Sequence, residues 1–588
     1  MCGIAGIYSI KGPDPQREEI ERMTQALAHR GPDGQGFFLE GPIAFGHRRL
    51  SIIDLESGKQ PMESTSARTI VSYNGEIYNY RELRKDLISD GYRFETKSDT
   101  EVILALYEKY GMKFLQFLSG MFAIALWDRQ TKKLIMVRDR IGIKPLYICR
   151  YNGRIYFASE IKSIRAAVPN LNKLNLHAVN SYFTRQYIGG RETIFESIEK
   201  LPPAMSLEIS QDKCIERKYW QPEPHHGNGL SLSAAAKKLD ELFDRSVKGH
   251  LVSDVPVGIF LSGGVDSSCL LAFGAQNSSE PLDTFSVGFG ESSKYNEIEY
   301  ARVLAKKYNT RHHEIHVTPS EVLDILPFII KELDEPLADY AILPTYIMSR
   351  FAAERVKVVL SGEGADELFG GYKRYRFYAM RDRLPLKRIF NCKAPVGPFL
   401  FKERNRKCLL KNFVECQYLK AEVKSLEDRL FFQSAGYLNS MLYTDIKNWL
   451  VDDLLMKVDK MCMLASLEAR VPYLDQNVVE FLLSLSGNLK VGLREKKRLL
   501  KAVAMSYIPL EIIQRPKHGF TVPVGEWLKG PLKKTFEEIV FDNSKISDWI
   551  NLSYVGRLMQ DHLQGKKKLG LRLWSIFIFS WWAEQNLS

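Results

Sequence analysis

A Ser/Gly-rich turn at residues 261–268, with the sequence LSGGVDSS, constrains the fold of this chain more than any other stretch. It follows an apolar run typical of a buried parallel strand and precedes another that begins a packed helix. Two glycines let the backbone approach a ligand closely, and the amides at a helix N-terminus attract anions. The turn contains Asp266 but lacks the lysine of a GxxxxGK[ST] loop. It therefore predicts a site for the pyrophosphate of ATP, which is held together with a divalent metal. The carboxylate of Asp266 would face that metal. An ordinary tight turn is the alternative.

The length and the cysteines limit the kind of protein. A chain of 588 residues is expected to form two to four domains. Its eight cysteines include no CxxC pair, so neither a zinc site nor a disulfide framework is indicated. The N-terminus has no signal-peptide pattern, and the apolar run 573–582 is shorter than the roughly 20 residues that span a bilayer. We expect a cytoplasmic protein without a membrane span, and a buried helix at 573–582.

Positive charge is concentrated in one segment. The chain has a net charge of +12, and residues 373–411 contain 13 Lys and Arg against two acids. Such a segment could bind an anionic partner, or it could form solvated helix faces and loops, which is the interpretation that we favour. No basic-aromatic motif accompanies it, so a nucleic acid is not an expected partner.

Residues 1–165 are rich in short β segments. This pattern, interrupted by a few amphipathic helices, predicts stacked antiparallel sheets covered by helices. The expected strands are 3–8, 36–39, 43–48, 69–73, 122–127, 133–138, 146–150 and 155–158, and the expected helices are 17–28, 80–90 and 100–110.

Cys2 is a candidate nucleophile. Removal of Met1 would leave Cys2 with a free α-amine beside its own thiol. Because such an amine titrates near ~7.7–8.0, it can act as the general base without a separate histidine.

Five polar clusters follow in order: MCGIAGI, HRGPDG, HRRLSIID, NGEIYN and SDTEV. Together they resemble the class II (N-terminal nucleophile) glutamine amidotransferase domain. The resemblance implies that Cys2 attacks the glutamine amide, that Asn74 and Gly75 form the oxyanion hole and that Arg30 braces the site. Arg49 would pair with the substrate carboxylate and Asp99 with its ammonium group. The implied glutamine-binding residues are Arg49, Leu50, Ser51, Ile52, Ile53, Asn74, Gly75, Glu76 and Asp99. The alternative for Asn74-Gly75 is a type I′ hairpin turn.

Beyond a linker-like stretch at 221–229, strands and helices alternate. Expected strands at 255–261, 283–289, 311–317 and 356–360, with helices at 298–308 and 320–332, predict a doubly wound parallel sheet. Ligands bind beyond the carboxyl ends of such strands. The LSGGVDSS turn and a second loop, SGEGADELFGGY from residue 361, both lie there. The rest of the chain is expected to be mostly helical.

These two loops, with LLMKVDKM and LEARVPYLD, resemble the synthetase half of the asparagine synthetase family, which has an ATP pyrophosphatase fold. The resemblance implies that Glu363 acts in forming or aminating an acyl-adenylate, that Lys457 stabilises phosphate charge, and that Asp266 and Asp366 bind Mg²⁺. The implied ATP-binding residues are Leu261, Ser262, Gly263, Gly264, Asp266, Ser267, Ser268, Val287, Ser361, Gly362 and Lys457.

The resemblance covers residues 1 to about 583 and implies two domains, an amidotransferase at 2–210 and a synthetase at 230–588. It implies an asparagine synthase that hydrolyses glutamine and channels the ammonia to a second site. There ATP and Mg²⁺ convert aspartate to β-aspartyl-AMP, and ammonolysis gives asparagine, AMP and diphosphate. An enzyme of the same family that amidates another carboxylate, such as a uronic acid of a surface polysaccharide, is the alternative. The expected partners are small molecules, and the resemblance suggests a homodimer.

Overall fold

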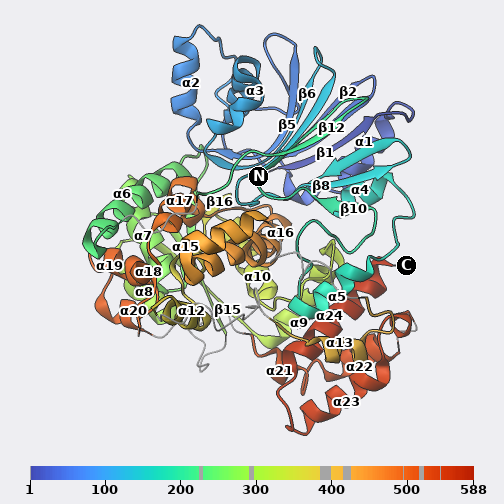
Figure 1. Ribbon diagram of the computed structural model, residues 1–588, viewed down its shortest axis with the longest axis vertical. Helices are drawn as coiled ribbons and strands as arrows, with labels where there is room; N and C mark the ends of the chain where they lie inside the picture. Colours follow the sequence, from blue (N-terminus) through green and yellow to red (C-terminus); the bar gives the residue numbers. More distant parts are fainter. Residues whose placement is uncertain are drawn as a thin grey trace.

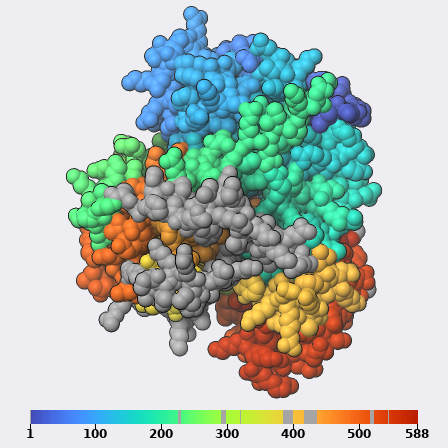
Figure 2. Space-filling model, viewed as in Figure 1, coloured from blue at the N-terminus to red at the C-terminus, as the bar shows by residue number. Residues whose placement is uncertain are grey.

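The computed structural model describes residues 2–223, 229–289, 297–383, 399–414, 426–493, 495–515, 522–542 and 545–587. Its fold is mixed α/β, with antiparallel sheets in the N-terminal part, a parallel sheet in the C-terminal part and a helical region after it (Figure 1). In the space-filling view, the blue N-terminal residues gather at one end of the molecule and the red C-terminal residues at the other (Figure 2).

Two six-stranded antiparallel sheets form the N-terminal part. The first has the order β10(Ile198–Lys200), β8(Tyr147–Tyr151), β9(Arg154–Ala158), β1(Gly3–Ser9), β3(Ile43–Arg49), β2(Gly34–Glu40). The second has the order β12(Cys214–Lys218), β11(Met205–Ile209), β7(Lys133–Arg138), β6(Gly120–Asp128), β5(Thr69–Ile77), β4(Met62–Glu63). Apolar side chains from both sheets, including Ile4, Phe45, Ala123 and Trp127, share one buried cluster, so the sheets stack face to face.

Helices cover the outer faces of both sheets. α1(Arg17–Gln25) and α4(Ile161–Ala167) pack on the first sheet, and α3(Asp99–Tyr110) packs on the second with α2(Tyr80–Ser89) beside it. The predicted stacked-sheet fold is confirmed. The strand β5 is four residues longer than the predicted 69–73: it continues to Ile77, and within it Asn74 pairs with Ala123 and Gly75 with Phe122 of β6. Asn74 and Gly75 therefore lie inside a strand and do not form a hairpin turn.

A five-stranded parallel sheet forms the core of the C-terminal part. Its order is β15(Arg311–Val317), β14(Asp283–Phe289), β13(Val257–Phe260), β16(Val358–Leu360), β17(Glu468–Arg470). The four predicted strands are confirmed, and β17, which is only three residues long, is an addition. One face packs on α6(Leu232–His250), α7(Val265–Asn277) and α8(Ile298–Lys307), the other on α10(Ile342–Ala353) and α16(Met456–Leu464). The strand order reverses between β13 and β16, which makes their carboxyl ends a topological switch point.

The remaining elements are mainly helical. They are η1(Ala28–Arg30), η2(Gly111–Gln116), α5(Leu176–Arg185), α9(Pro319–Glu332), α11(Ala365–Phe369), α12(Lys373–Arg383), α13(Glu403–Leu409), α15(Leu426–Asp445), the π-helical η3(Ile446–Leu455), η4(Pro472–Leu474), α17(Gln476–Ser484), α18(Gly487–Lys490), α19(Arg498–Ala504), α20(Leu510–Gln514), α21(Val524–Trp527), α22(Lys533–Phe541), η5(Ile546–Asp548), α23(Leu552–Leu563) and α24(Gly570–Asn586). None of the helices in the described part of the chain is both long and apolar enough to cross a membrane.

The basic segment 373–411 lies only partly within the described residues, because 384–398 are outside them. Two of its arginines form internal contacts. Arg374 pairs with Asp445 at 2.7 Å, and the buried Arg406 donates to Asn180 Oδ1 at 2.7 Å. These two charges stabilise the fold and are not displayed to a partner.

The apolar C-terminal run forms the buried helix α24, as predicted. Its residues Trp574 and Trp582 are fully buried, and the Trp582 indole donates to Leu333 O at 2.9 Å. In Figure 1, α24 lies beside α5, which comes from the first third of the chain, and Tyr182 Oη donates to Ser575 O at 2.7 Å. The helix thus joins distant parts of the sequence.

We expect Trp582→Ala to lower the free energy of unfolding by about 3–5 kcal/mol, because it leaves a cavity and removes the indole donor. Denaturant unfolding followed by circular dichroism measures this. Leu571→Ala, on the same helix but 43% exposed, is the control and should change it by less than about 1 kcal/mol. Equal losses for both variants would contradict the role given to Trp582.

Candidate functional site

Cys2 lies directly before β1 and is buried against Asn74 of β5. Its backbone N–H donates to Asn74 Oδ1 at 2.9 Å, which orients the side-chain amide. Asn74 Nδ2 is also buried, and it has no hydrogen-bond acceptor among the described residues. Because an unsatisfied buried N–H is costly, this donor is well suited to a ligand oxygen beside Cys2. Burial raises the pKa of the Cys2 thiol, so its ionisation requires a base.

Gly75 follows Asn74 at a place where only glycine fits. A Cβ at this position would lie 2.1 Å from Met121 O and 2.7 Å from Phe122 Cα of the neighbouring strand. The close pairing of β5 with β6 therefore determines the residue type, and it holds the Gly75 amide next to the Asn74 side chain.

Arg49 ends β3 and shapes the loop after it. Its guanidinium donates to Ile53 O at 3.0 Å and to Asp54 O at 2.5 Å. The loop residues between them, Leu50, Ser51, Ile52 and Ile53, are all buried. The positive charge of Arg49 also acts on the Cys2 thiol. The structure thus brings Arg49 and its loop to Cys2, the predicted nucleophile.

Two buried carboxylates lie beyond Asn74. Asp99, at the start of α3, accepts from Tyr73 Oη at 3.0 Å and from Ile77 N at 3.1 Å, and burial raises its pKa. Glu76 pairs at 3.3 Å with Arg470, which comes from β17 of the parallel sheet. Of the predicted glutamine-binding residues, Asn74, Leu50 and Arg49 act directly on Cys2, and Glu76 contacts the other half of the molecule.

The first glycine-rich loop follows β13. Ser262 Oγ accepts from Gly264 N at 3.3 Å, and Ser268 Oγ donates to Gly264 O at 2.7 Å. Gly263 has a φ of +66°, and a Cβ there would lie 2.7 Å from Tyr300 Cβ. Leu261 N donates to Phe285 O of β14 at 2.8 Å. Val287 lies two residues further along that strand.

The second loop follows β16 and touches the first. Ser361 N donates to Arg470 O at 2.8 Å, so the same arginine whose side chain pairs with Glu76 anchors this loop. A Cβ on Gly362 would lie 3.4 Å from Asp266 Cβ, an ordinary van der Waals contact, so the two loops lie against each other at this point. The two predicted ATP-binding loops thus form one site at the switch point of the sheet.

A lysine that the sequence patterns did not indicate joins the two predicted metal ligands. Lys497 Nζ lies 2.5 and 2.6 Å from the carboxylate oxygens of Asp266 and 2.6 Å from Asp366 Oδ1. The described residues contain no group of three or more His, Cys, Asp or Glu that could hold a metal ion. Two carboxylates brought together around a cation still fit Mg²⁺, which takes its other ligands from phosphates and water.

Lys457 and Glu363 form the other side of this site. Lys457, near the start of α16, is buried and lies 3.2 Å from Asp339 and 3.6 Å from Glu363. Burial disfavours its charge, but Asp339 and Glu363 outweigh this effect and raise the pKa of Lys457. The ammonium group therefore remains charged beside Glu363, as its predicted role of stabilising phosphate requires.

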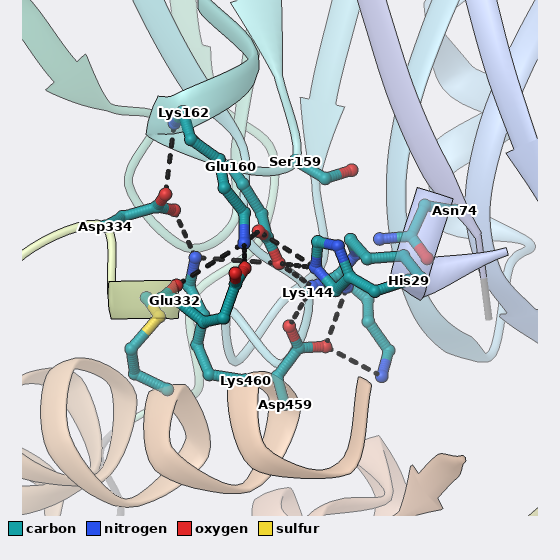
Figure 3. A network of polar contacts seen from close by, with 12 residues as sticks. His29, Asn74, Lys144, Ser159, Glu160, Lys162, Glu332, Asp334, Asp459 and Lys460 are labelled. Atoms are coloured by element: carbon teal, nitrogen blue, oxygen red, sulfur yellow. Dashed lines mark hydrogen bonds and ion pairs between the residues drawn. The ribbon is translucent and has the colours of Figure 1, made fainter. Parts of the chain in front are cut away.

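An ion-pair network joins the surroundings of Cys2 to α16, the helix that also carries Lys457 (Figure 3). Arg30 Nε donates to Cys2 O at 3.2 Å, and its terminal nitrogens lie 2.8 Å from Glu160 and 2.8 and 3.2 Å from Asp459. In Figure 3, Asp459 and Lys460 extend from the pale orange helix toward the N-terminal part. Burial opposes the charge of Asp459, but Arg30 and Lys144 lower its pKa.

A second pair in this network connects the same parts. Lys460 pairs with Asp334, whose carboxylate also accepts from the backbone N–H groups of Ile161 and Lys162 at 2.9 and 3.0 Å. Asp334 thereby caps α4 of the N-terminal part. Of the network residues, the sequence motifs indicate a role only for Arg30. Asp459 and Arg470 lie in LLMKVDKM and LEARVPYLD, and those motifs give neither residue a role.

Two family models match the chain. A glutamine amidotransferase domain matches residues 1–220, and asparagine synthase matches residues 238–584. "Asparagine synthetase [glutamine-hydrolyzing] 1" of Bacillus subtilis is 35% identical over 100% of this chain and 97% of its own length. "Asparagine synthetase B [glutamine-hydrolyzing]" of Escherichia coli is 30% identical over 92% of this chain and 86% of its own.

Among solved structures, the allosteric regulatory enzyme of purine biosynthesis aligns with a TM-score of 0.31 and 15% identity over 54% of this chain and 80% of that chain. The asparagine synthase model matches more than half of the chain, and relatives that align over nearly its full length are 30–35% identical to it. The chain belongs to the asparagine synthase family.

Proposed function

We propose that this protein makes asparagine from aspartate, with glutamine as the nitrogen donor and ATP as the source of activation. The observation that carries the proposal is the position of α16 between two distinct sites. Lys457 of this helix faces Glu363 and the glycine-rich loops, and Asp459 holds the arginine that contacts Cys2. The names and full-length coverage of the relatives support the same reaction.

In the glutamine half, the Cys2 thiolate attacks the carboxamide carbon of glutamine. The proposal requires removal of Met1, so that the α-amine of Cys2 accepts the thiol proton. Asn74 Nδ2 and the Gly75 N–H stabilise the oxyanion, and protonation of the leaving nitrogen releases ammonia. Water then hydrolyses the thioester to glutamate. The buried amide nitrogen of Asn74 supports this assignment, because it has no acceptor among the described residues.

In the synthetase half, an oxygen of the aspartate side-chain carboxylate attacks the α-phosphorus of ATP, and pyrophosphate leaves. Lys457 stabilises the negative charge that develops on the phosphates. Mg²⁺ held by Asp266 and Asp366 would neutralise charge on the leaving pyrophosphate. Ammonia then attacks the acyl carbon of β-aspartyl-AMP, Glu363 accepts a proton from the nitrogen, and AMP leaves.

Ammonia must reach the adenylate before water does. Apolar residues from both parts support a dry junction, since Met121, Ile141 and Ile143 pack in one buried cluster with Leu454 and Leu455. In this proposal residues 2–210 form the amidotransferase domain and 230–588 the synthetase domain, and the enzyme works in the cytoplasm. We expect a homodimer, as the family resemblance suggests.

The proposed reaction is tested by incubating the protein with ATP, Mg²⁺, glutamine and aspartate and measuring asparagine, AMP and pyrophosphate together. We expect the three products in equal amounts, each dependent on aspartate. AMP release that continues without aspartate, or that requires a uronic acid instead, would overturn aspartate as the acceptor.

Cys2→Ala should abolish glutamine-dependent synthesis and leave ammonia-dependent synthesis within about twofold of the wild type, because the two sites are separate. The measurement compares asparagine formation with glutamine and with ammonium chloride as donors. Cys214→Ala, at an exposed cysteine, is the matched control and should keep both activities. Loss of both activities in a folded Cys2→Ala protein would contradict the two-site assignment.

Glu363→Gln should lower asparagine formation from either donor by about 10²-fold or more and leave glutamine hydrolysis intact, because the proton acceptor is lost. Glu367→Gln is the control in the same loop. Glu367 is buried, accepts from Tyr372 Oη at 2.6 Å, and has a pKa raised to about 7 by burial, so a neutral amide suits its surroundings. A greater loss in the control than in Glu363→Gln would reverse the assignment.

Asp459→Asn should lower the kcat of glutamine hydrolysis at least about tenfold, with a smaller change in KM, because Arg30 loses its bidentate partner and no longer holds Cys2 in place. Breaking this buried pair should also cost about 3–5 kcal/mol of stability. Glutaminase rates and denaturant unfolding measure the two effects. Glu332→Gln, at a half-buried partner of Lys162, is the control. An unchanged kcat in Asp459→Asn would show that Arg30 does not depend on Asp459.

A further inference from the structure

The Lys497 ammonium group occupies the position between Asp266 and Asp366. It makes three contacts of 2.5–2.6 Å with these carboxylates, and its side chain is only 6% exposed. The two acids come from different loops, Asp266 from the first turn of α7 and Asp366 from the first turn of α11. Without a cation between them, two carboxylates this close would repel each other.

The backbone is shaped to deliver this side chain. Lys497 has a φ of +54° and a ψ of +35°, a left-handed conformation that costs a non-glycine residue about 1–2 kcal/mol. Such strain persists where the surrounding structure holds it, and it concentrates at functional sites. The next residue, Arg498, begins α19, so the strained residue fixes the entry of that helix.

Gly371 provides the space for the lysine. A Cβ at this position would lie 1.7 Å from Asp366 Oδ1 and 2.5 Å from Lys497 Cε. The absence of a side chain at Gly371, the left-handed backbone of Lys497 and the carboxylates of two loops thus converge on one ammonium group. A surface lysine that pairs by chance has no such support.

Further positive charge lies next to this centre. Lys496 is near Lys497, Lys373, Lys501 and Arg376, and its pKa is lowered by burial and by their charges. The cations near Asp266 and Asp366 carry more charge than these two carboxylates can neutralise. Such a surplus of positive charge suits a highly charged anion, such as pyrophosphate. Two of these cations, Lys373 and Arg376, begin the basic segment 373–411.

We propose that Lys497 is an internal counter-ion, which occupies the divalent-metal position between Asp266 and Asp366 while the ATP site is empty. When ATP arrives with Mg²⁺, the ammonium group gives up the carboxylates and pairs with the pyrophosphate oxygens. The lysine therefore competes with free divalent metal but cooperates with metal-bound ATP. The inference rests on the proposed ATP site and adds a positioning residue to it.

The test measures Mn²⁺ binding without ATP, by electron paramagnetic resonance of free Mn²⁺. Lys497→Met and Lys497→Gln should bind Mn²⁺ about tenfold or more tightly than the wild type. Both variants lack the ammonium group that competes with the metal for the two carboxylates. Lys497→Arg keeps the charge and should remain as weak as the wild type. Lys534→Met, at a lysine of α22 whose side chain is 88% exposed, is the control and should bind Mn²⁺ as weakly as the wild type.

The same neutral variants should lose at least about tenfold in aspartate-dependent ATP–pyrophosphate exchange and keep their glutaminase activity, which reports on folding. A neutral variant that is too unstable to assay should regain its melting temperature with Mn²⁺ alone. Mn²⁺ affinity unchanged by the neutral variants, or an unstable variant that Mn²⁺ does not restore, would overturn the inference. The proposed ATP site is tested separately, by whether ATP–pyrophosphate exchange by the wild type requires aspartate. A failure of this inference is therefore distinguishable from a failure of the proposed function.

Discussion

The buried guanidinium of Arg30 is the constraint on which the joint between the two halves depends. A cation without solvent must be paired, and its partners come from both parts of the molecule: Glu160 from the end of the first sheet and Asp459 from α16. Replacing such a network with apolar residues often leaves stability unchanged, so its main effect is on specificity. A rotation of one half against the other would leave these buried charges without partners. Cys2, whose carbonyl accepts from Arg30, is fixed by that docking.

The geometry of α16 explains how one helix can serve two sites. Successive residues turn by about 100°, so Lys457 and Asp459 point about 200° apart, to nearly opposite sides. One side meets Glu363 and Asp339, the other Arg30 and Lys144. The π-helical segment η3 leads directly into α16, and an extra residue per turn of this kind changes which side chains face a site. The helix is therefore both a wall of the proposed ATP site and the brace of the proposed glutamine site.

The sequence predicts best those features that depend on a pattern within a short stretch of residues, such as the periodicity of a strand or a loop motif. The stacked sheets, the parallel sheet and the contact of its two glycine-rich loops followed from alternation, apolar runs and glycine positions, and the roles of individual residues came from family resemblance. Asn74-Gly75 shows the limit of local rules, because a dipeptide typical of a hairpin lies within β5, where pairing with β6 decides its conformation. Lys497 and Asp459 contact partners 231 and 429 residues away, and no local pattern reports such pairs. The strand β17 was missed because three residues show no periodicity.

The described sites share one physical feature: each reactive polar group is already partnered by the protein in a way that a substrate can replace or extend. Glu363 faces the ammonium group of Lys457, and Asp266 and Asp366 face that of Lys497. Asn74 is oriented by its oxygen, which leaves its nitrogen for the substrate. Because these charges are held in place before a ligand arrives, binding exchanges one set of partners for another and requires little reorganisation. Such exchange suits the proposed adenylation, because its ligands carry several negative charges and its intermediate must be kept from water.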